Sequence, residues 1–152
     1  LQLIERRIKH IRHYTEKKGI AIREDLTDVP EALFDPDRIN QAIDNLLNNA
    51  IKFSPPGTTI HVTLSRDDKH AVIKIRDEGP GIPPEKQGQL FGEFNTLGTK
   101  TTDGEKSTGF GLFIVKKIVD AHGGTINIKS APGQGAEFTF TVALSEGLNR
   151  QK

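Results

Sequence analysis

Residues 45–54 read Asn-Leu-Leu-Asn-Asn-Ala-Ile-Lys-Phe-Ser and end a helical segment that begins near residue 37, after Asp35 and Pro36. Aspartate and proline are typical of a helix start. Apolar side chains recur through residues 37–52 with the period of an amphipathic helix. They are Ile39, Ala42, Ile43, Leu46, Leu47 and Ala50. The stretch therefore predicts a helix that buries one side against the rest of the fold.

The same helix has a second, polar face. Asn45, Asn49 and Lys52 follow one another at intervals of four and three residues, so they lie about 100–130° around the helix from the apolar stripe. An asparagine oxygen is a hard ligand that suits Mg²⁺, and a lysine one turn further on is a point charge for phosphate. This face is either a metal and phosphate site or an ordinary solvated surface.

Other elements are expected on both sides of this helix. Residues 1–18 predict a helix whose thin apolar stripe has nearly heptad spacing and needs a partner, either a second helix or its own domain. Short strands are expected at 20–26, 60–64, 71–75, 126–128 and 138–142, and a third helix at 112–121. Hairpin connections at 66–69 and 132–135 favour an antiparallel sheet. Together these elements predict a two-layer α/β sandwich with helices on one face.

Residues 77–111 contain eight glycines and little periodicity, which is typical of a functional loop. Asp77 directly follows a strand, where its carboxylate can accept a hydrogen bond from an exocyclic amine, and Gly79 and Gly81 allow a flat ring to approach the backbone. Residues 108–112 place glycines at a helix N-terminus, where unpaired N–H groups favour phosphate. Each of these patterns alone also fits a plain turn.

Bulk composition is that of a globular domain, with 34% hydrophobic and 27% charged residues. The net charge of +1 gives no reason to expect nucleic acid as a partner. The chain has no cysteine, which excludes disulfides and thiolate chemistry. No apolar run approaches the roughly 20 residues that span a bilayer.

Taken in order, these stretches resemble the nucleotide-binding boxes of sensor histidine kinases in the GHKL superfamily. The N box resembles residues 45–54, the first glycine box 76–83, the F box 90–94, the second glycine box 104–112, and the closing turns 121–124 and 132–135. The resemblance runs from about residue 20 to residue 144. It implies the Bergerat ATP-binding fold, a mixed and mostly antiparallel sheet with helices on one face.

The resemblance also implies roles for individual residues, with ATP and Mg²⁺ as cofactors. Asn49 would bind Mg²⁺, Asn45 would lie beside the phosphates and the metal-bound water, Lys52 would contact the phosphates, and Asp77 would accept from the adenine amino group. Residues 85–108 would form a lid anchored by Phe91 and Phe94. The other nucleotide contacts it implies are those of Gly79, Gly81, Ile82, Phe94, Lys106, Thr108, Gly109, Gly111 and Leu112.

Asn45 separates subfamilies, because the related ATPases carry glutamate there to activate water. An amide cannot act as a general base, so we expect little ATP hydrolysis and transfer of the γ-phosphate to a protein histidine instead. Asp44 is the nearest carboxylate but points about 100° around the helix. The lid departs from the family at residues 95–96, where Asn-Thr replaces a common basic residue, so Lys100 or Lys106 is expected to contact the γ-phosphate.

The phosphoacceptor itself is not expected in this chain, because no His-Glu or His-Asp pair occurs and His10 and His13 fit a solvated helix surface. The expected organisation is the end of a dimerisation hairpin helix at 1–18, a catalytic domain at 19–145 and a flexible tail at 146–152. Expected partners are the phosphoacceptor hairpin of the same protein and a response regulator receiver domain. The parent protein is expected to be a homodimer, with this domain in the cytoplasm and a possible anchor in the inner membrane.

Two other functions remain open at this stage. One is a degenerate nucleotide-binding module that docks a partner without transfer. The other is an anti-sigma-factor-like serine kinase of the same superfamily, in which the N box differs and a helical segment such as 1–18 is unexpected. A gyrase-like ATPase is disfavoured because residue 45 is not glutamate.

Overall fold

The computed structural model describes residues 2–27, 35–81, 111–130 and 133–143. Within these ranges the elements follow the predicted order. They are α1 (Gln2–Lys18), β1 (Ala21–Leu26), α2 (Pro36–Phe53), β2 (Thr59–Arg66), β3 (His70–Asp77), α4 (Gly111–Ala121), β4 (Ile126–Ser130) and β5 (Ala136–Ala143). Each predicted helix and strand is confirmed, with ends that differ from the prediction by a few residues.

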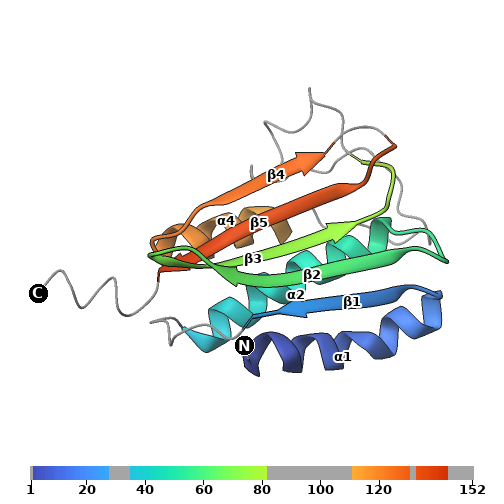
Figure 1. The fold of residues 1–152 in the computed structure, drawn as a ribbon, viewed down its shortest axis with the longest axis horizontal. Coiled ribbons are helices and arrows are strands. Elements are labelled where there is room, and N and C mark those ends of the chain that lie inside the picture. The colour runs from blue at the N-terminus through green and yellow to red at the C-terminus, as the bar shows by residue number, and fades with distance from the viewer. Residues whose placement is uncertain (1, 28–34, 82–110, 131–132, 144–152) are drawn as a thin grey trace, which may run out of the picture.

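The strands form one five-stranded sheet in the order β1-β2-β3-β5-β4 (Figure 1). β1 runs parallel to β2, while β2–β3, β3–β5 and β4–β5 are antiparallel pairs. The sheet is therefore mixed and mostly antiparallel, as the resemblance implied. β3 lies in the centre of the sheet, so the residue at its end is surrounded by neighbours on both sides.

Buried and more exposed side chains alternate along the strands, so one face of the sheet packs against the helix layer. On β2, Ile60, Val62 and Leu64 are buried, while the residues between them are only partly covered. β3 and β5 alternate in the same way, and their buried side chains join those of the helices in one core. α2 and α4 lie on the same side of the sheet (Figure 1). The helices thus cover one face and leave a polar face to solvent, which confirms the predicted sandwich.

α2 begins at a well-formed cap. The side chain of Asp35 accepts hydrogen bonds from the backbone N–H groups of Asp37 (3.0 Å) and Arg38 (3.3 Å), and Pro36 takes the first helical position. The backbone N–H of Asp35 donates to Nε2 of His122 (3.0 Å), whose Nδ1 lies 2.8 Å from the Ile118 carbonyl oxygen. These contacts fit a ring in which Nε2 accepts and Nδ1 donates. His122 therefore joins the start of α2 to the end of α4.

α1 packs against its own domain. Its apolar stripe, Ile4, Ile8 and Ile11, is buried in the same core as α2, and Thr15 further along the stripe is buried as well. A guanidinium nitrogen of Arg7 lies 3.1 Å from a carboxylate oxygen of Asp44 on α2. His10 and His13 are exposed, as predicted. Of the two partners considered for this stripe, the structure shows the chain's own domain; the assignment of 1–18 to a hairpin helix stays a prediction.

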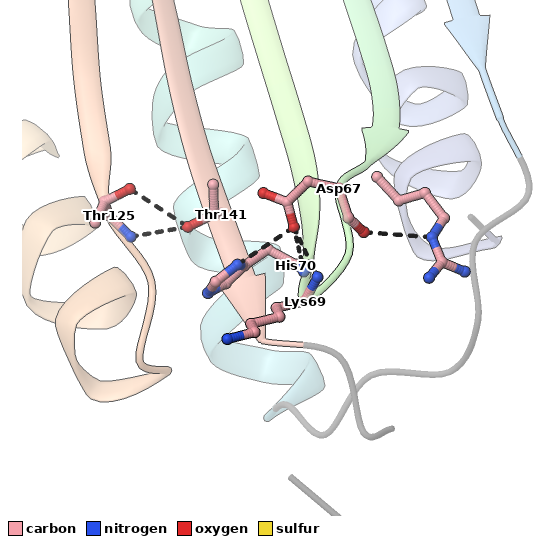
Figure 2. Close-up of polar contacts among 6 residues, drawn as sticks. Asp67, Lys69, His70, Thr125 and Thr141 are labelled. Atoms are coloured by element: carbon pink, nitrogen blue, oxygen red, sulfur yellow. Dashed lines mark hydrogen bonds and ion pairs between the residues drawn. The ribbon is translucent and has the colours of Figure 1, made fainter. Parts of the chain in front are cut away.

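The end of the sheet opposite Asp77 is closed by local hydrogen bonds (Figure 2). Oδ1 of Asp67 accepts from the backbone N–H groups of Lys69 (2.8 Å) and His70 (2.7 Å), which confirms the predicted hairpin turn between β2 and β3. These two bonds hold the pKa of Asp67 below its usual value. Nearby, the backbone N–H of Thr125 donates to Oγ1 of Thr141 (2.9 Å), joining β4 to β5.

Candidate functional site

The alternation of β3 determines where Asp77 lies. Ala71, Ile73 and Ile75 point into the core, and Asp77 continues the same two-residue period, so its carboxylate turns toward the helix layer. Only 4% of its surface is exposed. A carboxylate at this position in the pattern is expensive to bury and adds nothing to apolar packing. Its placement therefore indicates a functional group.

The backbone that follows Asp77 holds its carboxylate and the loop after β3 in place. The N–H of Gly79 donates to Oδ1 of Asp77 (2.9 Å). A Cβ added to Gly79 would lie 2.4 Å from the carbonyl oxygen of Phe53, the last residue of α2. Gly81 has a φ of +78°, a conformation that glycine adopts readily. The loop after β3 is thus held directly against the C-terminal end of α2.

The turn between β4 and β5 closes over the same loop. A Cβ on Gly135, whose φ is +76°, would lie 2.1 Å from the carbonyl oxygen of Asp77. The N–H of Gly133 donates to the carbonyl oxygen of Pro80 (2.6 Å). The sequence matched this turn to the family without giving its purpose. The structure shows that its glycines permit close backbone contact with the Asp77 loop.

Burial raises the pKa of Asp77 to about 6, and hydrogen bonds from the Gly79 and Ala136 N–H groups oppose the rise. The carboxyl is consequently ionised at neutral pH and protonated in mild acid. An ionised carboxylate accepts hydrogen bonds through both oxygens, whereas the protonated group has lost acceptor capacity. The site is therefore suited to bind an amine donor at a pH above the pKa of Asp77.

We expect the affinity of this chain for adenosine to fall about tenfold between about pH 7 and pH 5, because the ionised fraction of Asp77 falls by that factor. Adenosine is the right probe because it has no phosphate that titrates. Since the folded pKa of about 6 exceeds the ordinary 3.8, this group's stabilising contribution is present below 3.8 and lost as pH rises through about 6. Weaker binding at pH 5 would thus not come from the loss of this group's contribution to folding. A flat affinity over this range, followed by NMR titration, would contradict an ionised acceptor.

The C-terminal end of α2, where its polar face ends, lies against this loop in space. Asn45, Asn49 and Lys52 are all partly buried, and Lys52 immediately precedes Phe53, which contacts the Gly79 position. Asp44 forms an ion pair with Arg7 of α1, so its carboxylate is engaged away from this face, as predicted. The structure therefore brings the predicted base acceptor to the end of α2 that carries Lys52, with Asn49 about one helical turn before Lys52 and Asn45 about two turns before it.

Several predicted site residues lie outside the described residues. They are Ile82, Phe91, Phe94, Lys100, Lys106, Thr108 and Gly109. Gly111 is the first residue of α4, and Leu112 packs partly buried against the core. In the described ranges no group of three or more His, Asp or Glu side chains clusters for a metal. A divalent cation would fit here through the hard amide oxygen of Asn49, completed by water and phosphate oxygens.

The class of protein with this arrangement is the nucleotide-binding sandwich, in which the sheet offers a base acceptor and an adjoining helix offers phosphate contacts. The chain belongs to the family of histidine kinase-, DNA gyrase B- and HSP90-like ATPases, which matches residues 34–146. The family's description names ATPases, so the match supports ATP as the nucleotide. The match leaves α1 and β1 outside its range.

The individual relatives that this chain matches include a sensory kinase and a sensor protein. The chain is 38% identical over 135 residues to the adaptive-response sensory kinase SasA of Prochlorococcus marinus, covering 88% of this chain and 35% of SasA. It is 39% identical over 113 residues to the sensor protein SrrB of Staphylococcus aureus, covering 74% of this chain and 19% of SrrB. The chain thus spans 35% of SasA and 19% of SrrB, roughly the size of one domain.

Solved structures agree. A mycobacterial sensor histidine kinase, MprB, matches with a TM-score of 0.81 and 29% identity over 94% of this chain and 93% of the MprB chain. Full-length ShkA in complex with AMPPNP also matches with a TM-score of 0.81 and 29% identity, over 94% of this chain and 30% of ShkA. Among the described helices of this chain, none is long and apolar enough to cross a membrane.

Proposed function

We propose that this domain binds Mg·ATP and donates the γ-phosphate to a histidine on a helical hairpin domain of the same protein. The observation that carries the proposal is the buried carboxylate of Asp77 at the end of the central strand, backed by Gly79 and the end of α2. A buried strand-end acceptor beside a glycine loop suits the amino edge of adenine. The family membership and the names of the relatives support the nucleotide and the phosphoryl transfer.

The polar face of α2 would hold the other end of the nucleotide. Asn49 would supply an amide oxygen to Mg²⁺, which when bound neutralises charge on the phosphate oxygens. Lys52 would contact the phosphates as a point charge, and Asn45 would lie beside the metal-bound water. The first turn of α4, which begins at Gly111, would offer backbone N–H groups to phosphate. Catalysis would then consist mainly of positioning and charge neutralisation.

Water would be a poor acceptor in this site. Asn45 has no basic oxygen, and the carboxylate of the adjacent Asp44 is paired with Arg7. The phosphoryl group would therefore persist until a protein nucleophile arrives. The acceptor would be the histidine hairpin of a homodimeric parent, and a response regulator receiver domain would take the phosphoryl group next. We place this domain in the cytoplasm, with a parent protein that an inner-membrane segment can anchor.

Transfer is expected when this chain and γ-labelled ATP are mixed with a separately produced histidine hairpin domain from a sensor kinase such as SrrB. The label should appear on the hairpin as an acid-labile adduct, because a phosphorylated imidazole hydrolyses in acid. Asn49→Ala should reduce transfer by about a hundredfold, the scale of losing one preorganised contact to developing charge. The readout is labelled hairpin resolved by gel, with and without acid treatment.

A hairpin whose histidine is replaced by glutamine is the matched control and should remain unlabelled. The two alternatives give different results. An acid-stable label on a serine-bearing partner would favour the anti-sigma-factor-like kinase. Intact ADP binding without transfer to any hairpin would favour a degenerate nucleotide-binding module.

A further inference from the structure

The last turn of α2 is closed by a side chain from another helix. The backbone N–H of Ser54 donates to the Ala50 carbonyl oxygen (3.0 Å), and Oγ of Ser54 donates to the same oxygen (2.7 Å). The next carbonyls are bound by Lys18 at the end of α1. Its Nζ donates to the carbonyl oxygens of Ile51 (2.6 Å) and Lys52 (3.3 Å). An ammonium group thus meets two carbonyls at the end of the helix, that of Lys52 and that of Ile51, to which the Ser54 N–H makes only a long bond (3.4 Å).

The Lys18 contact lies at the end of α2 that carries Lys52, where the phosphates are expected. That end of a helix is electrostatically unfavourable for an anion. The C-terminal end of a helix carries a partial negative charge, which repels phosphate. Lys52, whose side chain is proposed to contact the phosphates, is the penultimate residue of α2 and therefore lies at that negative end. A cation on the last carbonyls offsets the helix dipole by a charge of opposite sign.

Lys18 and Lys52 also face the same space. Both line an open cavity of about 510 Å³ between α1 and α2, together with Lys17, Tyr14 and Asn48. No described residue that lines this cavity carries a carboxylate. Lys18 and Lys52 therefore face a common volume from two helices.

We propose that Lys18 is a positioning residue for the phosphate end of the nucleotide. It fixes the last turn of α2, and with it the backbone of Lys52, and it offsets the negative end of the helix dipole beside the phosphates. The burial of the α1 stripe, including Ile8, fixes α1 so that Lys18 reaches these carbonyls. This inference rests on the proposed nucleotide site.

The test compares two ligands that differ only in phosphate. Lys18→Met keeps the aliphatic stem and removes the ammonium. In calorimetric or NMR titrations of the whole chain, ADP should bind about tenfold more weakly, the scale of a charge at a helix terminus together with its hydrogen bonds, while adenosine binding stays within about twofold. Lys18→Arg retains charge and donors and should keep ADP affinity. The ratio of the two affinities does not depend on the fraction of folded protein.

Lys17→Met is the matched control, because Lys17 is an exposed neighbour on the same helix that lines the same cavity. It should leave the ratio unchanged. If Lys17→Met lost as much ADP affinity as Lys18→Met, the effect would come from net charge alone. If Lys18→Met lost ADP and adenosine affinity equally, the effect would come from folding. Either result would overturn the inference while leaving the proposed function intact. Failure of the wild type to bind ADP would overturn both.

Discussion

Asp77→Asn is expected to weaken ADP binding about a hundredfold or more, because it replaces an acceptor with a group that presents N–H toward an amine donor. The cost has two parts, the lost charged hydrogen bond and the buried donors left unpaired. Calorimetric titration of ADP with and without Mg²⁺ measures it. Since burial raises the pKa of Asp77 to about 6, the buried ionised carboxylate lowers the folding stability of the wild type at neutral pH. The variant should therefore unfold no earlier than the wild type at pH 7.

Asp67→Asn is the matched control, since it makes the same chemical change at the opposite end of the sheet (Figure 2). Asp67 is exposed, and its turn contacts use an oxygen that asparagine also has. ADP affinity should be unchanged. If Asp77→Asn bound ADP as tightly as Asp67→Asn does, adenine would have to be recognised by another group and the proposed site would be wrong.

Secondary structure was predictable from this sequence because its local signals agree with one another. The period of Ile39, Ile43, Leu46 and Ala50, the cap at Asp35 and the alternation in β2 and β3 all match what the structure shows. The parallel pairing of β1 with β2 has no such signal. Hairpin turns specify antiparallel neighbours, whereas a strand separated from its partner by a helix can pair in either direction. Only the resemblance anticipated a mixed sheet.

Contacts between residues that are far apart in the sequence were the main feature that the sequence could not predict. The heptad-like stripe of α1 indicated a buried face but not which surface would bury it. Lys18 and Ile51 are 33 residues apart, so no periodicity links the lysine to the end of α2. The inward direction of Asp77 could have been inferred by extending the alternation of Ile73 and Ile75 one step further. That signal was present and would have distinguished Asp77 from an ordinary turn aspartate.

Gly79→Ala is expected to destabilise the fold by about 2–4 kcal/mol and to weaken ADP binding together with it. The added Cβ would lie 2.4 Å from the Phe53 carbonyl oxygen and 3.1 Å from Oδ1 of Asp77. The Phe53 oxygen belongs to backbone, so relief requires that either the end of α2 or the Asp77 loop moves. Either movement changes the distance between Asp77 and Lys52, which are proposed to hold opposite ends of one nucleotide. Thermal unfolding and ADP titration measure the two effects on the same sample.

Gly57→Ala separates this clash from the intrinsic cost of losing a glycine. Gly57 has a φ of +86° and no atom within 4 Å of an added Cβ, so alanine there should cost only about 1–2 kcal/mol of backbone strain and leave ADP affinity unchanged. The sequence pattern assigned Gly79 to the approach of a flat ring, whereas the structure assigns its missing side chain to the contact with α2. The ring explanation predicts weaker binding at an unchanged unfolding temperature. The contact explanation predicts that both fall, because the same backbone approach that holds the loop on α2 also sets the spacing between the base acceptor and the phosphate lysine.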